Sequence, residues 1–341
     1  MILFNSDYTE GAHPAIMEKL LETNMEQTVG YGEDPYCVEA RELIRKACKN
    51  EGAEVHFMVG GTQTNTTIIS SILRPYEGVL SAESGHINVH ETGAIESTGH
   101  KVLSLSSKDG KIDAKQIETA CKDHAADESF EHMVKPGMVY ISHPTELGTL
   151  YTAEELEDIH QVCQKWDLPL FLDGARLGYG LCAPKTDVTL ELIARFCDVF
   201  YIGGTKVGTL FGEAVIITNE ILQKEFRYMI KQKGGMLAKG RLLGIQFAEL
   251  FRDGLYYRMG QHGIDMAMLL KGEAVKKGYK LFMDSDTNQQ FLIVKDSKLA
   301  ELDQKYGTTY WGRVDESKSV IRICTSWATQ EKNVRELIED L

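Results

Sequence analysis

Hydrophobic and polar positions follow two alternating patterns over the first two thirds of the chain. Between about residues 35 and 217, short apolar runs are separated by stretches with the spacing of amphipathic helices. We expect buried strands over residues 55–59, 78–81, 101–105, 138–142, 170–172, 199–202 and 214–217. Strands that alternate with helices in this way predict a mainly parallel seven-stranded sheet with helices on both faces, and therefore an α/β domain.

Helix boundaries in this region have recognisable signals. Asp34-Pro35 predicts the start of a helix that runs towards Lys49, because proline is tolerated in the first turn. Gly60-Gly61 ends a strand and precedes a helix expected over 62–73, and Thr152 is expected to cap a helix over 153–166. The charged stretch at 122–131 is interpreted as a solvated loop or helix face.

The last third of the chain has a different pattern. A long helical stretch from Gly240, broken near Gly254, leads to strands expected over 279–283, 290–295, 308–310 and 320–324 and then to a final helix. We interpret this region as a smaller C-terminal α+β domain. The expected division is an N-terminal segment over 1–25, a large domain over 26–245 and a small domain over 246–341.

Composition and charge exclude several classes of function. The 341 residues are 43% hydrophobic and 26% charged, as in soluble globular proteins, and the length favours two domains. A net charge of −13 argues against binding to nucleic acid or to an anionic membrane. The seven cysteines form no Cys-x-x-Cys pair, so neither disulfides nor a metal site is expected. With no signal peptide or membrane-spanning run visible, we expect a cytoplasmic protein.

Three candidate functional residues or motifs each follow a predicted strand. Gly60-Gly61-Thr62-Gln63 could let a phosphate approach a helix N-terminus, although such turns are often only structural. Asp173 follows a buried strand where ligands of open α/β sheets bind, but it could equally be a helix cap. Lys206 also follows a strand and is bracketed by small residues, whereas most lysines are solvated surface residues.

The combination is more specific than its parts. Pyridoxal 5′-phosphate (PLP) needs a phosphate cradle, a carboxylate beside its pyridine nitrogen and a lysine that forms an imine with its aldehyde. Gly61, Asp173 and Lys206 supply these groups in that order, each at the end of a strand on the same edge of one sheet. The sequence therefore predicts a PLP enzyme.

Further motifs make the chain similar to a known family. It resembles the threonine aldolase/β-eliminating lyase group of fold-type I PLP enzymes over nearly its whole length. The matching motifs are Asn5-Ser6-Asp7, Tyr31-Gly-Glu-Asp-Pro35, Gly61-Thr-Gln-Thr-Asn65, Gly85-His86 with His90-Glu91, Asp173-Gly-Ala-Arg176, Thr205-Lys206, Gly234-Gly-Met236 and Ile321-Arg322. The run Asp173-Gly-Ala-Arg176 followed by Thr205-Lys206 is the most specific of these.

The resemblance implies a role for each cofactor-binding position. Lys206 would carry the cofactor, and Asp173 would pair with its ring nitrogen. Gly61 and Thr62 would bind the phosphate, with Thr205 helping. His86 would stack on the ring, and the alternative is a surface or core histidine.

It also implies a substrate site and a subunit interface. Arg322 would pair with the substrate carboxylate through two hydrogen bonds, and Ser6 would add another. Arg176 would contact the cofactor's phenolic oxygen or the substrate, unless it forms a structural ion pair. Tyr31 would reach the site of a neighbouring subunit, so we expect a homodimer or homotetramer.

Two positions depart from the family. After Gly234-Gly-Met236 the family commonly has an arginine, which Lys239 or Arg241 would replace here. The other departure concerns the substrate site. Threonine aldolases carry a second active-site histidine after the strand that precedes the Asp-Gly-Ala-Arg strand, and here Glu146 occupies that position. Glu146 and His86 are therefore both candidates for the base that takes the substrate's hydroxyl proton. Nearby Lys206 and Arg176 would lower the pKa of Glu146, whereas burial would raise it.

The expected reaction is cleavage of Cα–Cβ in a β-hydroxy-α-amino acid, such as threonine or allo-threonine, to glycine and an aldehyde. β-Elimination or transamination of another small amino acid is the alternative within the same cofactor class. A non-catalytic α/β phosphate-binding protein is the alternative from a different class, but it leaves Asp173 and Lys206 unexplained.

Overall fold

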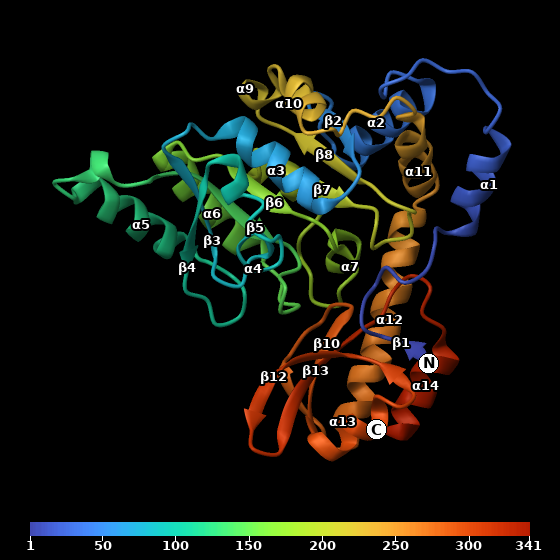
Figure 1. Ribbon diagram of the computed structural model, residues 1–341. Coiled ribbons are helices and arrows are strands. Elements are labelled where there is room, and N and C mark those ends of the chain that lie inside the picture. The colour runs from blue at the N-terminus through green and yellow to red at the C-terminus, as the bar shows by residue number, and fades with distance from the viewer.

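A seven-stranded sheet forms the centre of the large domain in the computed structural model, which describes residues 1–341 (Figure 1). The strand order is β2-β8-β7-β6-β5-β3-β4, and β8 alone runs antiparallel to its neighbours. The strands are β2 (Glu54–Met58), β3 (Glu77–Ala82), β4 (Lys101–Leu105), β5 (Lys135–Ser142), β6 (Leu170–Asp173), β7 (Val199–Gly203) and β8 (Glu213–Ile217). The expected mainly parallel, seven-stranded sheet is confirmed.

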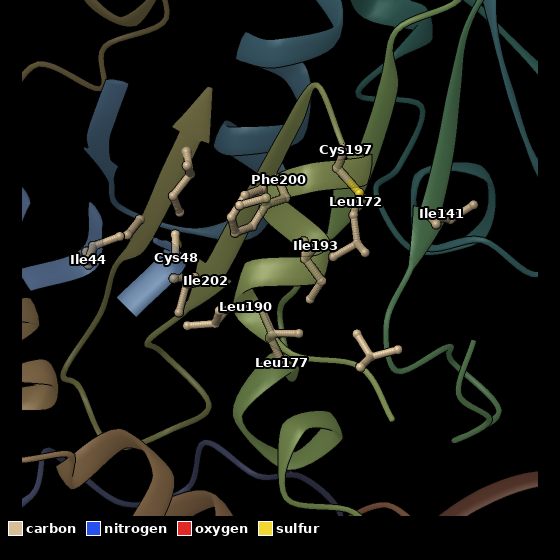
Figure 2. Close-up of a cluster of buried hydrophobic side chains, with 14 of the residues drawn as sticks. Ile44, Cys48, Ile141, Leu172, Leu177, Leu190, Ile193, Cys197, Phe200 and Ile202 are labelled. Atoms are coloured by element: carbon tan, nitrogen blue, oxygen red, sulfur yellow. The ribbon is translucent and has the colours of Figure 1, made fainter. Parts of the chain in front are cut away.

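Helices cover both faces of this sheet because its strands are apolar on both sides. One face packs against a core that includes residues of α2 (Pro35–Cys48), α5 (Ala114–Ala126), α6 (Ala153–Trp166), α7 (Leu177–Leu181), α8 (Leu190–Phe196) and α11 (Arg241–Arg252). Figure 2 shows part of that core, where Leu172, Phe200 and Ile202 of the sheet meet Leu190 and Ile193. The other face packs against α3 (Gly61–Ile72), α4 (His86–Val89) and α10 (Phe226–Gln232), and α9 (Glu220–Gln223) follows β8.

The small domain is an antiparallel sheet backed by helices (Figure 1). Its order is β12-β13-β10-β9, and the strands are β9 (Lys280–Met283), β10 (Gln289–Lys295), β12 (Thr309–Asp315) and β13 (Lys318–Cys324). One face shares a core with α12 (Leu255–Lys276), α13 (Asp296–Leu302) and α14 (Glu331–Asp340). β1 (Ile2–Leu3) pairs in parallel with β11 (Tyr306–Gly307), which attaches the N-terminal segment to this domain.

Capping signals place several helices as expected. The Asp34 carboxylate accepts a hydrogen bond from the Cys37 N–H at the start of α2. Thr152 and Glu155 form a capping box at the start of α6, whose bounds match the prediction. The break expected near Gly254 separates α11 from α12, because Gly254 adopts a left-handed conformation there.

Several helices have no predicted bounds from the sequence: α1 (Pro14–Glu22), α5, α7, α8, α10 and α13. The predicted boundary at 245/246 lies inside α11, which packs against α2 of the large domain. α12 then contacts both α7 and α14. The domain division therefore remains a proposal. None of the helices combines the length and apolar composition needed to cross a membrane.

Candidate active site

A hollow of about 300 Å³ lies where β2, β5, β6 and β7 end. β2 and β7 both run antiparallel to β8, so their carboxyl ends meet at the same edge of the sheet as that of β6. Eight of the predicted site residues line this hollow: Gly61, Thr62, His86, Glu146, Asp173, Arg176, Thr205 and Lys206.

Asp173 is a buried carboxylate with four hydrogen-bond donors. Its Oδ1 accepts from the Tyr201 hydroxyl at 2.6 Å and from the Ala175 N–H at 3.0 Å. Its Oδ2 accepts from the Tyr140 hydroxyl at 2.6 Å and from the Asn65 side-chain amide at 3.3 Å. Burial alone would raise the pKa of Asp173, but nearby His86 and these donors outweigh it and lower the pKa. Asp173 is therefore held ionised, and it does not cap a helix.

Strand alternation explains these partners. Tyr140, Asp173 and Tyr201 point to the α3 side of the sheet, because Tyr140 and Tyr201 belong to the core on that side. Asn65 on α3 completes the set. In return, burial and the Asp173 charge raise the pKa of both tyrosines well above the usual value, so both stay protonated and donate.

Lys206 lies in the loop that follows β7. Its backbone carbonyl accepts from the Tyr179 hydroxyl at 2.7 Å, which fixes the chain at this point. Burial and the neighbouring Arg176 lower the pKa of the Lys206 amine, and so favour the neutral, nucleophilic form. At the end of β7 the backbone passes close to that of Ala175. Only glycine fits at position 203, since a Cβ there would lie 2.2 Å from the Ala175 carbonyl oxygen.

The N-terminus of α3 forms another wall. Gly60 precedes this helix and offers no side chain to the N–H groups of the first turn. Both Gly61 and Thr62 line the hollow, so these N–H groups and the positive end of the helix dipole face it. A Cβ on Gly60 would meet nothing within 4 Å, which leaves room for a ligand there.

Thr205 and Glu213 form a pair beside that wall. The Thr205 hydroxyl lies 2.8 Å from Glu213 Oε1 and accepts from the Gly212 N–H at 3.0 Å. The other carboxyl oxygen of Glu213 accepts from the Gly204 N–H at 3.2 Å. Glu213 is only 4% exposed, and burial raises its pKa to about 8. Glu213 was not among the residues predicted from the sequence.

The Glu91 carboxylate, part of the His90-Glu91 motif, orients His86. Glu91 Oε1 lies 2.7 Å from His86 Nδ1 and accepts from the Asn65 amide at 2.7 Å. Asn65 also contacts Asp173, so the amide links His86 to the cluster around that carboxylate. The rings of His86 and His90 are 5.7 Å apart.

Glu146 lies in the hollow and is held on one side of its carboxyl group. Its Oε1 accepts from the His86 backbone N–H at 3.0 Å and from the Ser142 hydroxyl at 2.7 Å, while its Oε2 has no partner. The sequence left open whether basic neighbours or burial would dominate. Burial dominates, and with the repulsion from Asp173 it raises the pKa of Glu146.

Arg176 forms the structural ion pair that had been the alternative to a ligand contact. Its Nε and Nη2 donate to the Asp7 carboxylate at 2.7 and 2.9 Å, and Asn288 also donates to Asp7. Arg176 nevertheless lines the hollow, so the pair fixes the orientation of its guanidinium at the edge of the site.

Three predicted residues lie outside the lining of the hollow. Ser6 is buried beside Asp7. Tyr31 lines a separate hollow, and the Lys231 ammonium lies over its ring. Arg322 donates to Gln289 and to the Asn5 carbonyl and forms no ion pair, and its Nε has no partner. Burial, His86 and the Arg322 charge together lower the pKa of His90, which indicates that the Arg322 guanidinium lies near that ring.

The residues of the hollow fit the three functional groups of pyridoxal phosphate. A buried amine with a lowered pKa suits the aldehyde, and an ionised, fixed carboxylate suits the ring nitrogen. The uncapped start of α3 suits the phosphate. No group of three or more His, Cys, Asp or Glu side chains is arranged to hold a metal ion.

Sequence reasoning missed Tyr140, Tyr201, Asn65, Glu91 and Glu213 as site residues. Tyr140 and Tyr201 lie within apolar strands, where an aromatic residue indicates only core. Strand register offered a signal. Each tyrosine lies on the same face of the sheet as Asp173, near the end of its strand where the hollow lies.

Comparison with known proteins agrees with this geometry. The family model for β-eliminating lyases matches residues 4–297. A low-specificity L-threonine aldolase from Pseudomonas sp. (strain NCIMB 10558) is 32% identical, with the match covering 99% of this chain and 96% of that protein. The structure of a Leishmania major threonine aldolase superposes with a TM-score of 0.97 at 45% identity, covering 99% and 98% of the two chains.

A more distant structure shares the fold alone. Aspartate aminotransferase from Thermus thermophilus has a TM-score of 0.73 at 13% identity, covering 100% of this chain and 90% of that one. The expected fold-type I architecture is therefore confirmed.

Proposed function

The chain belongs to the β-eliminating lyase family, and on that premise we propose that it is a pyridoxal-phosphate-dependent lyase. Its proposed reaction cleaves Cα–Cβ of a threonine-like β-hydroxy-α-amino acid to glycine and an aldehyde. One observation carries the proposal: Lys206, Asp173 and the N-terminus of α3 meet in a single hollow. The names of the relatives, low-specificity L-threonine aldolase and threonine aldolase, support the choice of substrate.

The cofactor would be held by residues already described. Lys206 would form the covalent link, Asp173 would keep a proton on the ring nitrogen, and the first turn of α3 would bind the phosphate. When bound, pyridoxal phosphate supplies an electron sink for the pair of electrons released at the substrate's Cα. His86, fixed by Glu91, would lie against the ring.

Recognition of the substrate carboxylate needs a positive charge that no protein carboxylate already neutralises. Arg322 meets that condition, because its hydrogen-bond acceptors are the Gln289 side chain and the Asn5 carbonyl and it forms no ion pair. A carboxylate could accept two hydrogen bonds from its guanidinium. The Asp7 carboxylate already engages Arg176, so we assign Arg176 a supporting position beside the substrate.

Cleavage requires removal of the substrate's hydroxyl proton as Cα–Cβ breaks, and a proton must then be added at Cα to give glycine. Glu146 and His86 remain the two candidates for the first transfer. Glu146 is favoured by its free Oε2, which has no hydrogen-bond partner and belongs to a side chain that lines the hollow. Because its pKa is raised, the ionised, basic form of Glu146 becomes abundant at a higher pH than for an ordinary glutamate.

The proposal includes a homodimer or homotetramer in which Tyr31 reaches a neighbouring site. Tyr31 is 48% exposed and lines a different hollow from the one that contains Lys206, so its side chain is available to a neighbouring subunit. All seven cysteines are free thiols, which supports a cytoplasmic location.

The test is a product assay with purified protein, pyridoxal phosphate and a panel of threonine, allo-threonine, serine and phenylserine isomers. Equal amounts of glycine and aldehyde are expected. Ammonia with a keto acid would instead indicate β-elimination, and amino transfer to an added keto acid would indicate an aminotransferase. Lys206→Ala is the control that should abolish every product.

A further inference from the structure

Glu213 lies where an additional negative charge would oppose cofactor binding. It is the first residue of β8 and lines the hollow together with Thr205, Gly61 and Thr62. Gly61 and Thr62 belong to the first turn of α3, to which the proposed function assigns the cofactor's phosphate, and Thr205 is expected to help bind it. A buried carboxyl group beside a phosphate site needs an explanation, and the following inference rests on that proposed function.

The Thr205 hydroxyl has one proton and two acceptor positions. The Gly212 N–H occupies one acceptor position at 3.0 Å. If Glu213 is ionised, the only proton of Thr205 is committed to Glu213 Oε1 at 2.8 Å. If Glu213 is protonated, its own O–H can donate to Thr205, and the Thr205 proton becomes free for a ligand in the hollow.

The charged and titratable groups around Glu213 come from four elements. Lys206 lies in the adjacent loop, Asp173 ends β6, Tyr201 lies on β7 and Tyr256 on α12. The residue opposite Glu213 on β2 is Met58, and α3 contains no charged residue. Lys206 is therefore the single positive charge among these groups, and the proposed reaction would bind it covalently to the cofactor.

We propose that Glu213 is a proton-carrying positioning residue of the phosphate cradle: as a neutral acid it turns the Thr205 hydroxyl towards the phosphate, and as a carboxylate it turns that hydroxyl away. Burial is consistent with this role, because it raises the pKa of Glu213 to about 8. A phosphate ester is already a dianion at neutral pH, since its second pKa is about 6. Between about pH 7 and pH 9 the phosphate group therefore does not change its charge, but Glu213 does.

The consequence is a pH dependence specific to the phosphate. A ligand that requires protonated Glu213 binds at full strength below the pKa of that group and loses affinity as pH rises through it. We expect affinity for pyridoxal phosphate, relative to pyridoxal, to fall about tenfold between about pH 7 and about pH 9. Pyridoxal forms the same imine with Lys206 but lacks the phosphate, so the ratio removes the pH dependence of imine formation.

The experiment measures dissociation constants of both ligands with cofactor-free, full-length protein over that pH range. Wild type should show the tenfold change in the ratio. Glu213→Gln should show a constant ratio, because the amide is neutral and can still donate to Thr205. Thr205→Val should lower the preference for pyridoxal phosphate at the lower pH, because it lacks the hydroxyl.

Each outcome bears on the proposal. A constant ratio in wild type overturns it without any variant, and so does a Glu213→Gln protein that retains the wild-type change. Isothermal titration with methyl phosphate, a monoester whose charge is likewise constant over this pH range, should reproduce the wild-type trend and its loss in Glu213→Gln. If pyridoxal phosphate fails to bind covalently to Lys206, the proposed function fails instead, and the visible absorbance of the imine distinguishes the two failures.

Discussion

Four donors converge on the Asp173 carboxylate, two of them phenols that burial and the Asp173 charge keep protonated. Asp173→Asn removes the negative charge but keeps a similar shape. We expect cofactor to be retained at least in part, while activity falls by roughly two or more orders of magnitude, the scale of losing an essential electrostatic group. Glycine formation and visible absorbance measure the two effects. Activity within a few-fold of wild type would show that Asp173 is only structural.

Glu146 should give the reaction a pH dependence, because burial raises its pKa whereas that of Asp173 is lowered. If its carboxylate is the base, cleavage should speed up as pH rises through that pKa, because the ionised form accepts the proton. Glu146→Gln should reduce cleavage by roughly two or more orders of magnitude and remove this pH dependence. Exchange of glycine's α-proton needs no hydroxyl deprotonation and should survive.

The comparison of the two rates separates the interpretations of Glu146. Equal loss of cleavage and exchange would indicate that it organises the loop through the His86 N–H. No loss of either would leave His86 as the base.

Residues such as Asp173 and Lys206 could be found from sequence because each immediately follows an apolar strand. Glu213 could not, since its importance depends on a hydrogen bond to Thr205 across the turn that links β7 to β8. Asp7 was quoted as part of a motif, but its pairing with Arg176 joins segments far apart in the chain. Such pairings arise from tertiary packing and leave no local pattern.

At the scale of elements, the contact between α12 and α7 holds the Asp173–Arg176 turn in place, because α7 begins directly after that turn. A Cβ on Gly260 of α12 would lie 2.3 Å from the Gly178 carbonyl oxygen. Gly260→Ala should therefore force the helices apart and destabilise the protein by about 1–3 kcal/mol.

Gly272→Ala is the matched control on the same helix, where a Cβ would meet nothing within 4 Å. It should stabilise the protein by up to about 1 kcal/mol, the helix propensity difference between glycine and alanine. Thermal unfolding measures both variants. A Gly260→Ala protein as stable as wild type would show that the helix contact is not tight.

Elements with periodic patterns and caps were predictable, as α6 illustrates. β1 was not, because it has two residues and depends on pairing with β11 near the other end of the chain. The helix α5 was missed although Asp113 and Gln116 form a capping box, a signal that was present in the sequence.

At the scale of the whole molecule, exposed apolar side chains occur along residues 17–31, here called the N-terminal arm. Its members include Met17, Leu21, Met25, Val29 and Tyr31, of which Leu21 is 79% and Met25 is 88% exposed. The arm begins in α1, at the outer edge of the large domain beside α11 (Figure 1). Apolar groups this exposed favour a protein interface, which agrees with the proposed oligomer.

Leu21→Glu with Met25→Glu should therefore reduce the oligomer to smaller species and reduce activity, because Tyr31 would no longer reach a neighbouring site. Light scattering coupled to gel filtration measures the mass. Phe282→Glu is the control, since Phe282 is 47% exposed but lies on β9 of the small domain. A doubly substituted protein with the wild-type mass would exclude the arm from the interface.

The central claim is that Lys206 carries the cofactor, and chemical trapping tests it most directly. Borohydride reduction of the protein with pyridoxal phosphate, followed by proteolysis and mass spectrometry, locates the modified lysine. We expect one pyridoxyl group per chain, on the peptide that contains Lys206, and none in Lys206→Ala. An unmodified Lys206, or a stoichiometric label on a different lysine, would contradict the account.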